Sequence, residues 1–428
     1  MMKKIFFTLL MMGQIIMATT IQYIETEDFK VPVIFEEDRR LPLVNMQFIF
    51  QNSGSITDTK KAGLAKFSAK ILGEGTKELG SSAFAESLES KAIHISSHAG
   101  SETLVIELGC LKEEFGDGLE KLQALLSDPN ISENAVKKVK TTTLGSLSSK
   151  QNDFDYVASN ELKRLLFKDT PLASPSSGTL KSVESIELKD VKNFIEEHLV
   201  SSKLIIAIGG DIDIEAAKKE IQKIIASMPK GELKKLAHYE VNEKVQESIL
   251  KKETEQAYVY FGSPYKIDYD SVDYYKAKVA IFILGTGGFG SRLMEEIRVK
   301  QGLAYSAYAR LSVSKSSSYL TGYLQTKLDS LEVAQKSVKE VIAEFVKSGV
   351  TEDELEQTKK FLLGSEPLRA ETMSQRLNRT FMEFYKGQEL GHSQKELELI
   401  KKLTLKDLNE FIKNHKEILD LSFAIVTK

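Results

Sequence analysis

Apolar residues recur along the chain with the two spacings that distinguish strands from helices. Short runs rich in β-branched and aromatic residues predict strands at 44–50, 103–108, 257–261 and 319–325. Apolar residues at helical spacing predict helices at 271–284, at 331–347 and around the leucines at 119–126. Strands separated by long helices and hairpins indicate an α+β fold in which helices cover one face of a sheet.

Polar residues mark where several helices begin. Ser132 and Thr351 each precede a Glu-rich segment, and Asp213 precedes a helix expected to run through Ser227. The side-chain oxygen of such a residue can accept a hydrogen bond from the free N–H groups of the first helical turn. A Pro, a Gly and several Lys then follow at 229–241, a composition typical of a linker.

An internal duplication divides the chain. Leu-Lys-Asp at 188–190 with Phe-Ile at 194–195 recurs 217 residues later, and each copy leads into an apolar run. Two further pairs of short strings are 219 residues apart: 131–133 with 350–352, and 144–146 with 363–365. The agreement in order and offset predicts two copies of one domain.

The predicted organisation has four parts. A signal peptide at 1–20 precedes one domain at 21–228, a linker at 229–241 and a second domain at 242–428. A chain of 428 residues suits two domains of about 200 residues each.

The N-terminus has the layout of a secretory signal peptide. Lys3 and Lys4 precede a nearly continuous apolar run, and Ala18 offers a cleavage position, so we expect export to the periplasm. Ile16 stands where a small residue is preferred, which keeps an uncleaved N-terminal anchor as the alternative. No later segment reaches the roughly 18 apolar residues of a membrane span, so no stable span is expected.

Composition argues against several partners. The net charge is −3, the two signs are interspersed and no block of Lys or Arg stands out, which disfavours nucleic acid and membrane surfaces. The single cysteine, Cys110, cannot form an internal disulfide. Its place after a predicted strand favours a small buried side chain.

The six histidines form no metal motif. His94 and His98 are four residues apart, but in a predicted strand this separates them by about 13 Å. Glu197 and His198 supply half of a His-x-x-Glu-His motif, with Phe194 at the first ligand position. We interpret all six as core or solvated residues, the other three being His238, His392 and His415.

A glycine-rich string at 285–290 resembles a phosphate loop only superficially. It lacks the Gly-Lys-Ser/Thr ending of such loops. We interpret it as a flexible connection that lets backbone approach closely.

The segment at 291–306 carries the most informative polar side chains. Gly302 ends a predicted helix, so Arg298 lies in the last helical turn and Tyr305 begins the next strand. A guanidinium offers planar donors to a carbonyl or carboxylate, and a tyrosine hydroxyl can donate to a developing oxyanion. The structural alternative is an Arg that stabilises the helix C-terminus and an ordinary half-buried Tyr.

The same segment carries a family resemblance. Its pattern Ser-Arg-Leu, then Arg-x-x-x-Gly-Leu-Ala-Tyr-Ser, closely resembles the C-terminal-domain signature of the pitrilysin/insulinase superfamily of zinc peptidases (family M16). The resemblance extends over nearly all of 21–428 and includes Gly-Leu-Ala at 63–65 and Gly-Glu-Gly-Thr at 73–76. It implies the LuxS/MPP-like metallohydrolase fold, with two homologous α+β domains, each a mostly antiparallel sheet packed against helices.

The resemblance also locates a metal motif that this chain lacks. The family normally has His-x-x-Glu-His between those two strings, whereas here Lys66 and Lys70 occupy the ligand positions and Ala69 that of the general base. The third ligand, a Glu, would fall near Leu147, and residues 141–151 contain no acid. Two ammonium groups one helical turn apart repel Zn²⁺, so we expect neither a metal nor a catalytic residue in this chain.

The resemblance implies the role of a partner subunit. In several two-subunit members one chain has the zinc motif and the other has an Arg/Tyr pair that contacts substrate, and Arg298 and Tyr305 match the spacing of that pair. We expect a non-catalytic subunit of a heteromeric zinc metalloprotease that closes the chamber and positions a peptide. The partner would be a homologue carrying His-x-x-Glu-His, and it would hold the zinc.

Two other functions are compatible with the sequence. One is a scaffold or binding protein of this fold without a proteolytic role, which a protease assay with and without the partner would distinguish. The other is a self-sufficient peptidase with an atypical metal site. The scarcity of histidines argues against it, and metal analysis would settle it.

Overall fold

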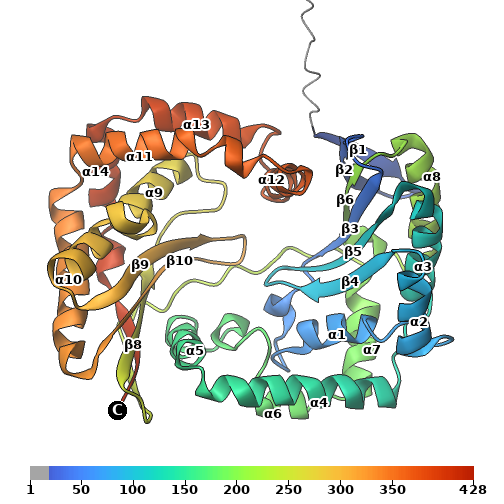
Figure 1. Ribbon diagram of the computed structural model, residues 1–428, viewed down its shortest axis with the longest axis horizontal. Coiled ribbons are helices and arrows are strands. Elements are labelled where there is room, and N and C mark those ends of the chain that lie inside the picture. Colours follow the sequence, from blue (N-terminus) through green and yellow to red (C-terminus); the bar gives the residue numbers. More distant parts are fainter. Residues whose placement is uncertain (1–18) are drawn as a thin grey trace, which may run out of the picture.

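The computed structural model describes residues 19–428 and shows two halves, each built around one sheet (Figure 1). The predicted signal peptide lies outside the described residues, except that Thr19 and Thr20 precede and begin the first strand. Within the described part of the chain, no helix is long and apolar enough to cross a membrane.

The first sheet has six strands in the order β1-β2-β6-β3-β5-β4. Neighbouring strands are antiparallel except for the parallel pair β2 and β6. The strands are β1 (Thr20–Glu25), β2 (Lys30–Glu37), β3 (Leu43–Gln51), β4 (His94–Ala99), β5 (Thr103–Leu111) and β6 (Leu204–Gly210).

The second sheet has five strands in the order β7-β11-β8-β10-β9, with only β7 and β11 parallel. This order and these directions repeat those of β2-β6-β3-β5-β4, so the predicted duplication and the mostly antiparallel α+β fold are confirmed. The strands are β7 (Glu247–Lys251), β8 (Gln256–Pro264), β9 (Ala304–Val313), β10 (Ser318–Lys327) and β11 (Ser422–Thr427).

The helices follow the same duplication. Ser132, Asp213 and Thr351 cap α4, α8 and α11 through their side chains, as predicted. The first half contains α1 (Leu64–Leu72), α2 (Gly80–Glu89), α3 (Phe115–Ser127), α4 (Glu133–Ser149), α5 (Phe154–Leu166), α6 (Leu180–Glu184), α7 (Leu188–His198) and α8 (Ile214–Ser227). The second contains α9 (Tyr274–Ile281), α10 (Leu331–Ser348), α11 (Glu352–Gly364), α12 (Met373–Tyr385), α13 (His392–Lys402) and α14 (Leu405–Asn414).

One expectation about local structure is confirmed and another is corrected. The helix expected over 271–284 is present from Tyr274 onward, as α9 followed by a π-helical turn, η6 (Phe282–Thr286). The glycine-rich string is helical too, since a 3₁₀ turn (Gly288–Gly290) follows η6. The close backbone approach is confirmed, because a Cβ on Gly285 would lie 2.2 Å from the backbone nitrogen of Ala309.

Between α8 and β7, residues 228–246 form no helix or strand, and the predicted linker lies in this stretch.

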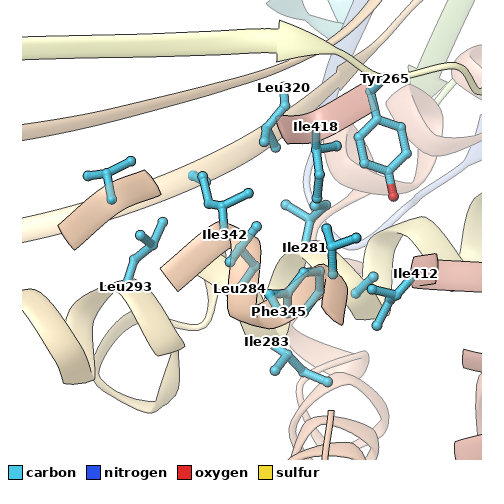
Figure 2. Close-up of a cluster of buried hydrophobic side chains, with 14 of the residues drawn as sticks. Tyr265, Ile281, Ile283, Leu284, Leu293, Leu320, Ile342, Phe345, Ile412 and Ile418 are labelled. Atoms are coloured by element: carbon cyan, nitrogen blue, oxygen red, sulfur yellow. The ribbon is translucent and has the colours of Figure 1, made fainter. Parts of the chain in front are cut away.

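The expectation that helices cover one face of each sheet is incomplete. The helices of each half bury one face, and Figure 2 shows part of that core in the second half, including Ile342 and Phe345 of α10. The opposite face of the first sheet packs against Leu377 and Tyr385 of α12, which belongs to the second half. Each half therefore completes the core of the other, as the position of α12 beside the first sheet shows (Figure 1).

The exchange is reciprocal, because α5 of the first half packs on β8 and β11 of the second sheet. Leu162 and Leu166 of α5 are buried against Ala424 of β11. The bounds of α5 and α12 are 219 residues apart, which is the offset that the sequence repeats show.

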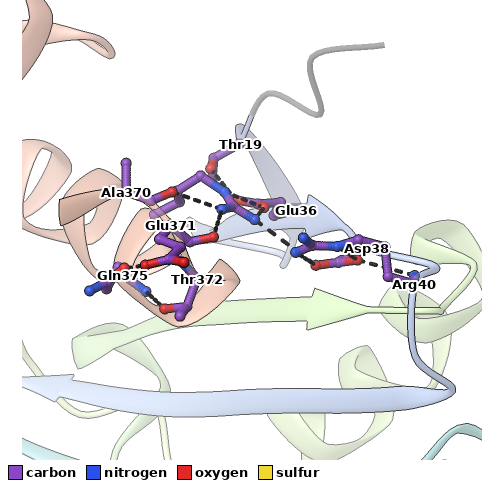
Figure 3. A network of polar contacts seen from close by, with 9 residues as sticks. Thr19, Glu36, Asp38, Arg40, Ala370, Glu371, Thr372 and Gln375 are labelled. Carbon is purple, nitrogen blue, oxygen red and sulfur yellow. Dashed lines mark hydrogen bonds and ion pairs between the residues drawn. The ribbon is translucent and has the colours of Figure 1, made fainter. Parts of the chain in front are cut away.

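A buried ion pair fixes α12 to the first sheet (Figure 3). Glu36 of β2 is fully buried, and its Oε1 accepts a hydrogen bond from Nε of Arg376 at 2.7 Å. Its other oxygen accepts one from the Thr19 hydroxyl at 2.7 Å. The Arg376 guanidinium also donates to the carbonyl oxygens of Ala370 and Glu371, so it holds the chain entering α12.

Removing the guanidinium should destabilise the protein strongly. Arg376→Met keeps much of the apolar stem but leaves the Glu36 carboxylate buried with only a hydroxyl partner, which costs about 3 kcal/mol of unfolding free energy. Denaturant unfolding measures this loss. Lys223→Met removes an exposed partner of Glu220 and serves as the control, with an expected loss below about 1 kcal/mol. Equal losses of unfolding free energy in the two variants would contradict the conclusion that Arg376 holds α12 against the first sheet.

Candidate functional site

The site predicted from the sequence has two parts, one in each half. The first is the metal-motif position, defined by Lys66, Ala69, Lys70 and Leu147, on α1 and α4. The second is the segment around Arg298 and Tyr305, at the start of β9.

Helix α1 carries Lys66 and Lys70 on a side that its packing leaves partly open. Ala65 and Ala69 pack against the first sheet, while Phe67 and Ile71 pack into a separate core beneath it. The Asp58 carboxylate accepts hydrogen bonds from the N–H groups of Gly63 and Ala65, both at 2.9 Å, and so secures the helix start. Two sides of α1 are thus packed against the two cores, and Lys66 and Lys70 project from the remaining side.

The two lysines bind hydroxyl groups. Nζ of Lys66 donates to Oγ of Ser176 at 2.8 Å, and Nζ of Lys70 donates to Oγ1 of Thr143 at 3.1 Å. Burial lowers the pKa of Lys66 from its ordinary value, and the charges of Lys150 and other nearby lysines lower it further. Burial and Lys150 likewise lower the pKa of Lys70. The ammonium groups gathered at this position therefore repel one another.

These donors do not fit a zinc ion. Ammonium groups repel the cation, and the methyl group of Ala69 offers no lone pair. Leu147 is buried beside Phe67 and Ile71, and the residue of α4 that contacts Lys70 is Thr143. Over residues 19–428, the side chains of His, Cys, Asp and Glu form no group of three or more that could hold a metal ion.

Among the described residues, no histidine is hydrogen-bonded to Lys66, Ala69 or Lys70. His94 and His98 are exposed on β4, as their predicted strand requires. His198, which the sequence placed in half of a zinc motif, ends α7, and its ring stacks on Phe194 with centroids 4.3 Å apart. Its Nδ1 lies 3.2 Å from the Ser53 hydroxyl and 3.1 Å from Nζ of Lys203. It is a buried, hydrogen-bonded core histidine, and Cys110 in β5 is likewise a buried core residue.

Arg298 lies in a π-helical segment, η8 (Met294–Lys300), and Tyr305 begins β9 as expected. Gly302 ends the helix in a left-handed conformation, φ 64°, and its N–H donates to the carbonyl oxygen of Arg298. Tyr305 is 82% exposed, so the alternative of a half-buried tyrosine is wrong.

The Arg298 guanidinium lies 4.3 Å from the ring centroid of Tyr305 and 4.6 Å from that of Phe289. We call these three residues the aromatic stack. Phe289 is 64% exposed, so two of the three side chains are open to solvent. No role was predicted for Phe289 from the sequence. Its ring reaches Arg298 because the 3₁₀ turn before η8 (Gly288–Gly290) brings the two side chains together.

The two arginines of this segment differ in their partners, because Arg292 forms an ion pair and Arg298 does not. Arg292 makes a bidentate ion pair with Glu354 of α11, at 2.7 and 2.8 Å. In the part of the chain that the structure covers, Arg298 makes no ion pair and no side-chain hydrogen bond. Its planar donors thus remain available to a carbonyl or carboxylate of another molecule.

Fold and site together define a member of the insulinase family, peptidase family M16, and the chain belongs to that family. The family model described as "Insulinase (Peptidase family M16)" matches residues 44–180, and "Peptidase M16 inactive domain" matches residues 185–362. A Helicobacter pylori protein named "Non-peptidase homolog YmxG" is 45% identical over 429 aligned positions, which cover 100% of this chain and 99% of that protein.

Two solved structures share the fold. The peptidase M16 inactive domain from Pseudomonas fluorescens has a TM-score of 0.87 at 24% identity, and the match covers 95% of this chain and 97% of that one. The periplasmic protease PqqL from Escherichia coli has a TM-score of 0.77 at 14% identity, and the match covers 95% of this chain but 46% of that one.

The burial of His198 makes the stability of the folded protein depend on pH. Burial and the charge of Lys203 lower the pKa of His198 to about 4, below the value of about 6.5 in an unfolded chain. Between these values the unfolded state binds the additional proton, so stability is lost as pH falls from about 6.5 to about 4, by up to about 3 kcal/mol. Unfolding measured across this range should show a shallower loss for His198→Gln than for the parent. His94→Gln, at an exposed position, should follow the parent, and a loss of the same slope in all three proteins would contradict the prediction.

Proposed function

We propose that this chain is a non-catalytic subunit of a heteromeric peptidase and that it closes the chamber and positions the peptide. The observation that carries the proposal is the contrast between its two halves. Helix α1 has lysines where the family motif has ligands, whereas the second half keeps a partly exposed Arg298 and an exposed Tyr305. Within residues 19–428, neither side chain makes an ion pair or a side-chain hydrogen bond.

Two comparisons support a divided enzyme. The Helicobacter pylori relative, which matches this chain over its full length, carries the name of a non-peptidase homolog. The PqqL protease contains in one chain a little more than twice the length that this fold occupies. A second chain with an intact His-x-x-Glu-His motif would supply the missing part here, and with it the zinc and the general base.

In this proposal the residues of the second half hold the peptide by its backbone. The planar guanidinium of Arg298 donates to a carbonyl oxygen, and the rings of Phe289 and Tyr305 hold it in one orientation. The Tyr305 hydroxyl would donate to the peptide oxygen on which charge develops, and the zinc held by the partner would supply the activated water. The basic, apolar start of the chain supports export, so we place the assembly in the periplasm.

Turnover of the assembled complex tests the assignment. The complex is purified from the native host and assayed on peptides. Arg298→Lys, which loses the planar donor set, and Tyr305→Phe, which loses one hydroxyl, should each lower kcat/KM by about tenfold or more while unfolding stays unchanged. Arg39→Gln and Tyr23→Phe alter exposed residues of the first half and should leave turnover unchanged.

Unchanged turnover in both site variants would remove the role of the aromatic stack and favour a scaffold protein. A chain that purifies alone and never meets a homologue with the zinc motif would end the proposal of a subunit. Stoichiometric zinc in the isolated chain, together with proteolysis by that chain alone, would favour a self-sufficient peptidase.

Peptide binding can be followed directly, because the chain contains no tryptophan. Phe289→Trp places the only tryptophan of the chain in the aromatic stack and keeps an aromatic ring at position 289. A peptide that docks on Arg298 should change the tryptophan emission in a saturable manner. The same titration in an Arg298→Gln background should need about tenfold more peptide, and an identical curve would show that the peptide docks elsewhere.

A further inference from the structure

We propose that the metal-motif position has become a binding site for a compact oxyanion, a carboxylate or a phosphate, held by Lys66, Lys70, Lys150 and Lys163. We call these four residues the lysine cluster. The site concerns this chain alone, so the proposal does not depend on whether a partner subunit exists.

Three elements bring the lysine cluster together. Lys66 and Lys70 are one helical turn apart on the side of α1 that the core leaves free. Helix α4 packs on α1, and Lys150 follows its last residue. Lys163 comes from α5, and Tyr156 of the same helix has its ring centroid 5.1 Å from Nζ of Lys150.

Within residues 19–428, none of the four lysines takes part in an ion pair, although neighbours on the same elements do. Lys61, before α1, binds Asp190, and Lys138 of α4 binds Glu74. The nearby acids of α5 are already engaged, since Glu161 binds Arg164 and Asp155 accepts a hydrogen bond from the Tyr260 hydroxyl.

Like charges gathered without a counter-charge are unfavourable, and bound anions relieve that repulsion. Burial, and after it the repulsion, also lowers the pKa of Lys66 and Lys70, and burial lowers the pKa of Lys163. A bound anion therefore gains more from this cluster than from scattered surface lysines.

The hydroxyl groups favour an oxyanion with several acceptor oxygens. Ser176 and Thr143 accept hydrogen bonds from Lys66 and Lys70, so each hydroxyl still has its own hydrogen to donate. Ammonium and hydroxyl donors carried by α1, α4 and α5 suit a phosphate or a carboxylate, whose oxygens accept from several donors at once. The same arrangement excludes cations.

Thermal unfolding of the full chain tests the site. Sodium phosphate should raise Tm in a saturable manner, whereas sodium chloride at equal ionic strength should not. Lys66→Gln with Lys70→Gln should abolish the rise. Lys219→Gln with Lys223→Gln removes two exposed lysines at the same spacing on α8, so this control should keep it. A rise of equal size in both double variants would overturn the proposal.

Two further arms complete the test. An acidic peptide with a free C-terminus, compared with its amidated Gln counterpart, shows whether a peptide carboxylate competes with phosphate for the same lysines. If the double variant fails to fold, Lys150→Gln and Lys163→Gln are measured singly. Each should weaken phosphate binding by about tenfold, because each removes one charge-assisted hydrogen bond. Unchanged affinity in both single variants, or no saturable response of the parent to either anion, would also overturn the proposal.

Discussion

The relative arrangement of the two halves depends on the apolar second face of each sheet. Ile34, Ile49 and Ile205 are fully or almost fully buried, and the helix that covers them, α12, comes from the other half of the chain. Burial of apolar surface contributes about 25 cal/mol per Å², so separating the halves would expose both second faces at a large cost in free energy. Polar contacts between the two halves form within the arrangement that this apolar packing sets. Glu102, between β4 and β5, accepts hydrogen bonds from the Tyr385 hydroxyl at 2.9 Å and from the N–H of Ser316 at 2.7 Å.

The same exchange makes the site at α1 depend on the second sheet. Helix α5 is held by β8 and β11, yet it carries Tyr156 and Lys163 toward the elements around α1. The electrostatics at α1 therefore depend on where the second sheet holds α5. A change in the core between α5 and β11 would alter the charges around Lys66 without touching α1.

Local pattern predicted the elements but not their long-range packing. The caps at Ser132, Asp213 and Thr351 were predictable because each depends on residues within one helical turn. The repeat offset predicted two equivalent sheets, because duplicated strings record common ancestry of the two segments. The covering of the second faces was missed, since the apolar stripe of α5 or α12 shows that a partner surface exists but not which sheet provides it.

The candidate site divides in the same way. Lys66, Lys70 and Ala69 follow from one short string, and so do Arg298 and Tyr305. Phe289, Lys150 and Lys163 could not be found from spacing, because they reach these residues through a turn or from separate helices. The π-helical form of η8 also lay outside what an α-helical period can predict.

Helix α1 shows how the fold can persist while the chemistry at one position changes. Its alanines pack on the sheet, and Phe67 and Ile71 fill the second core, so the positions at 66 and 70 contribute little to packing. Substitution there alters charge and ligand chemistry while the helix stays in place, which is why the fold does not determine the function. Arg298 differs from these positions, because its guanidinium lies between two aromatic rings that leave its donors free. The two parts of the site lie on separate elements with separate packing, and they can therefore diverge independently.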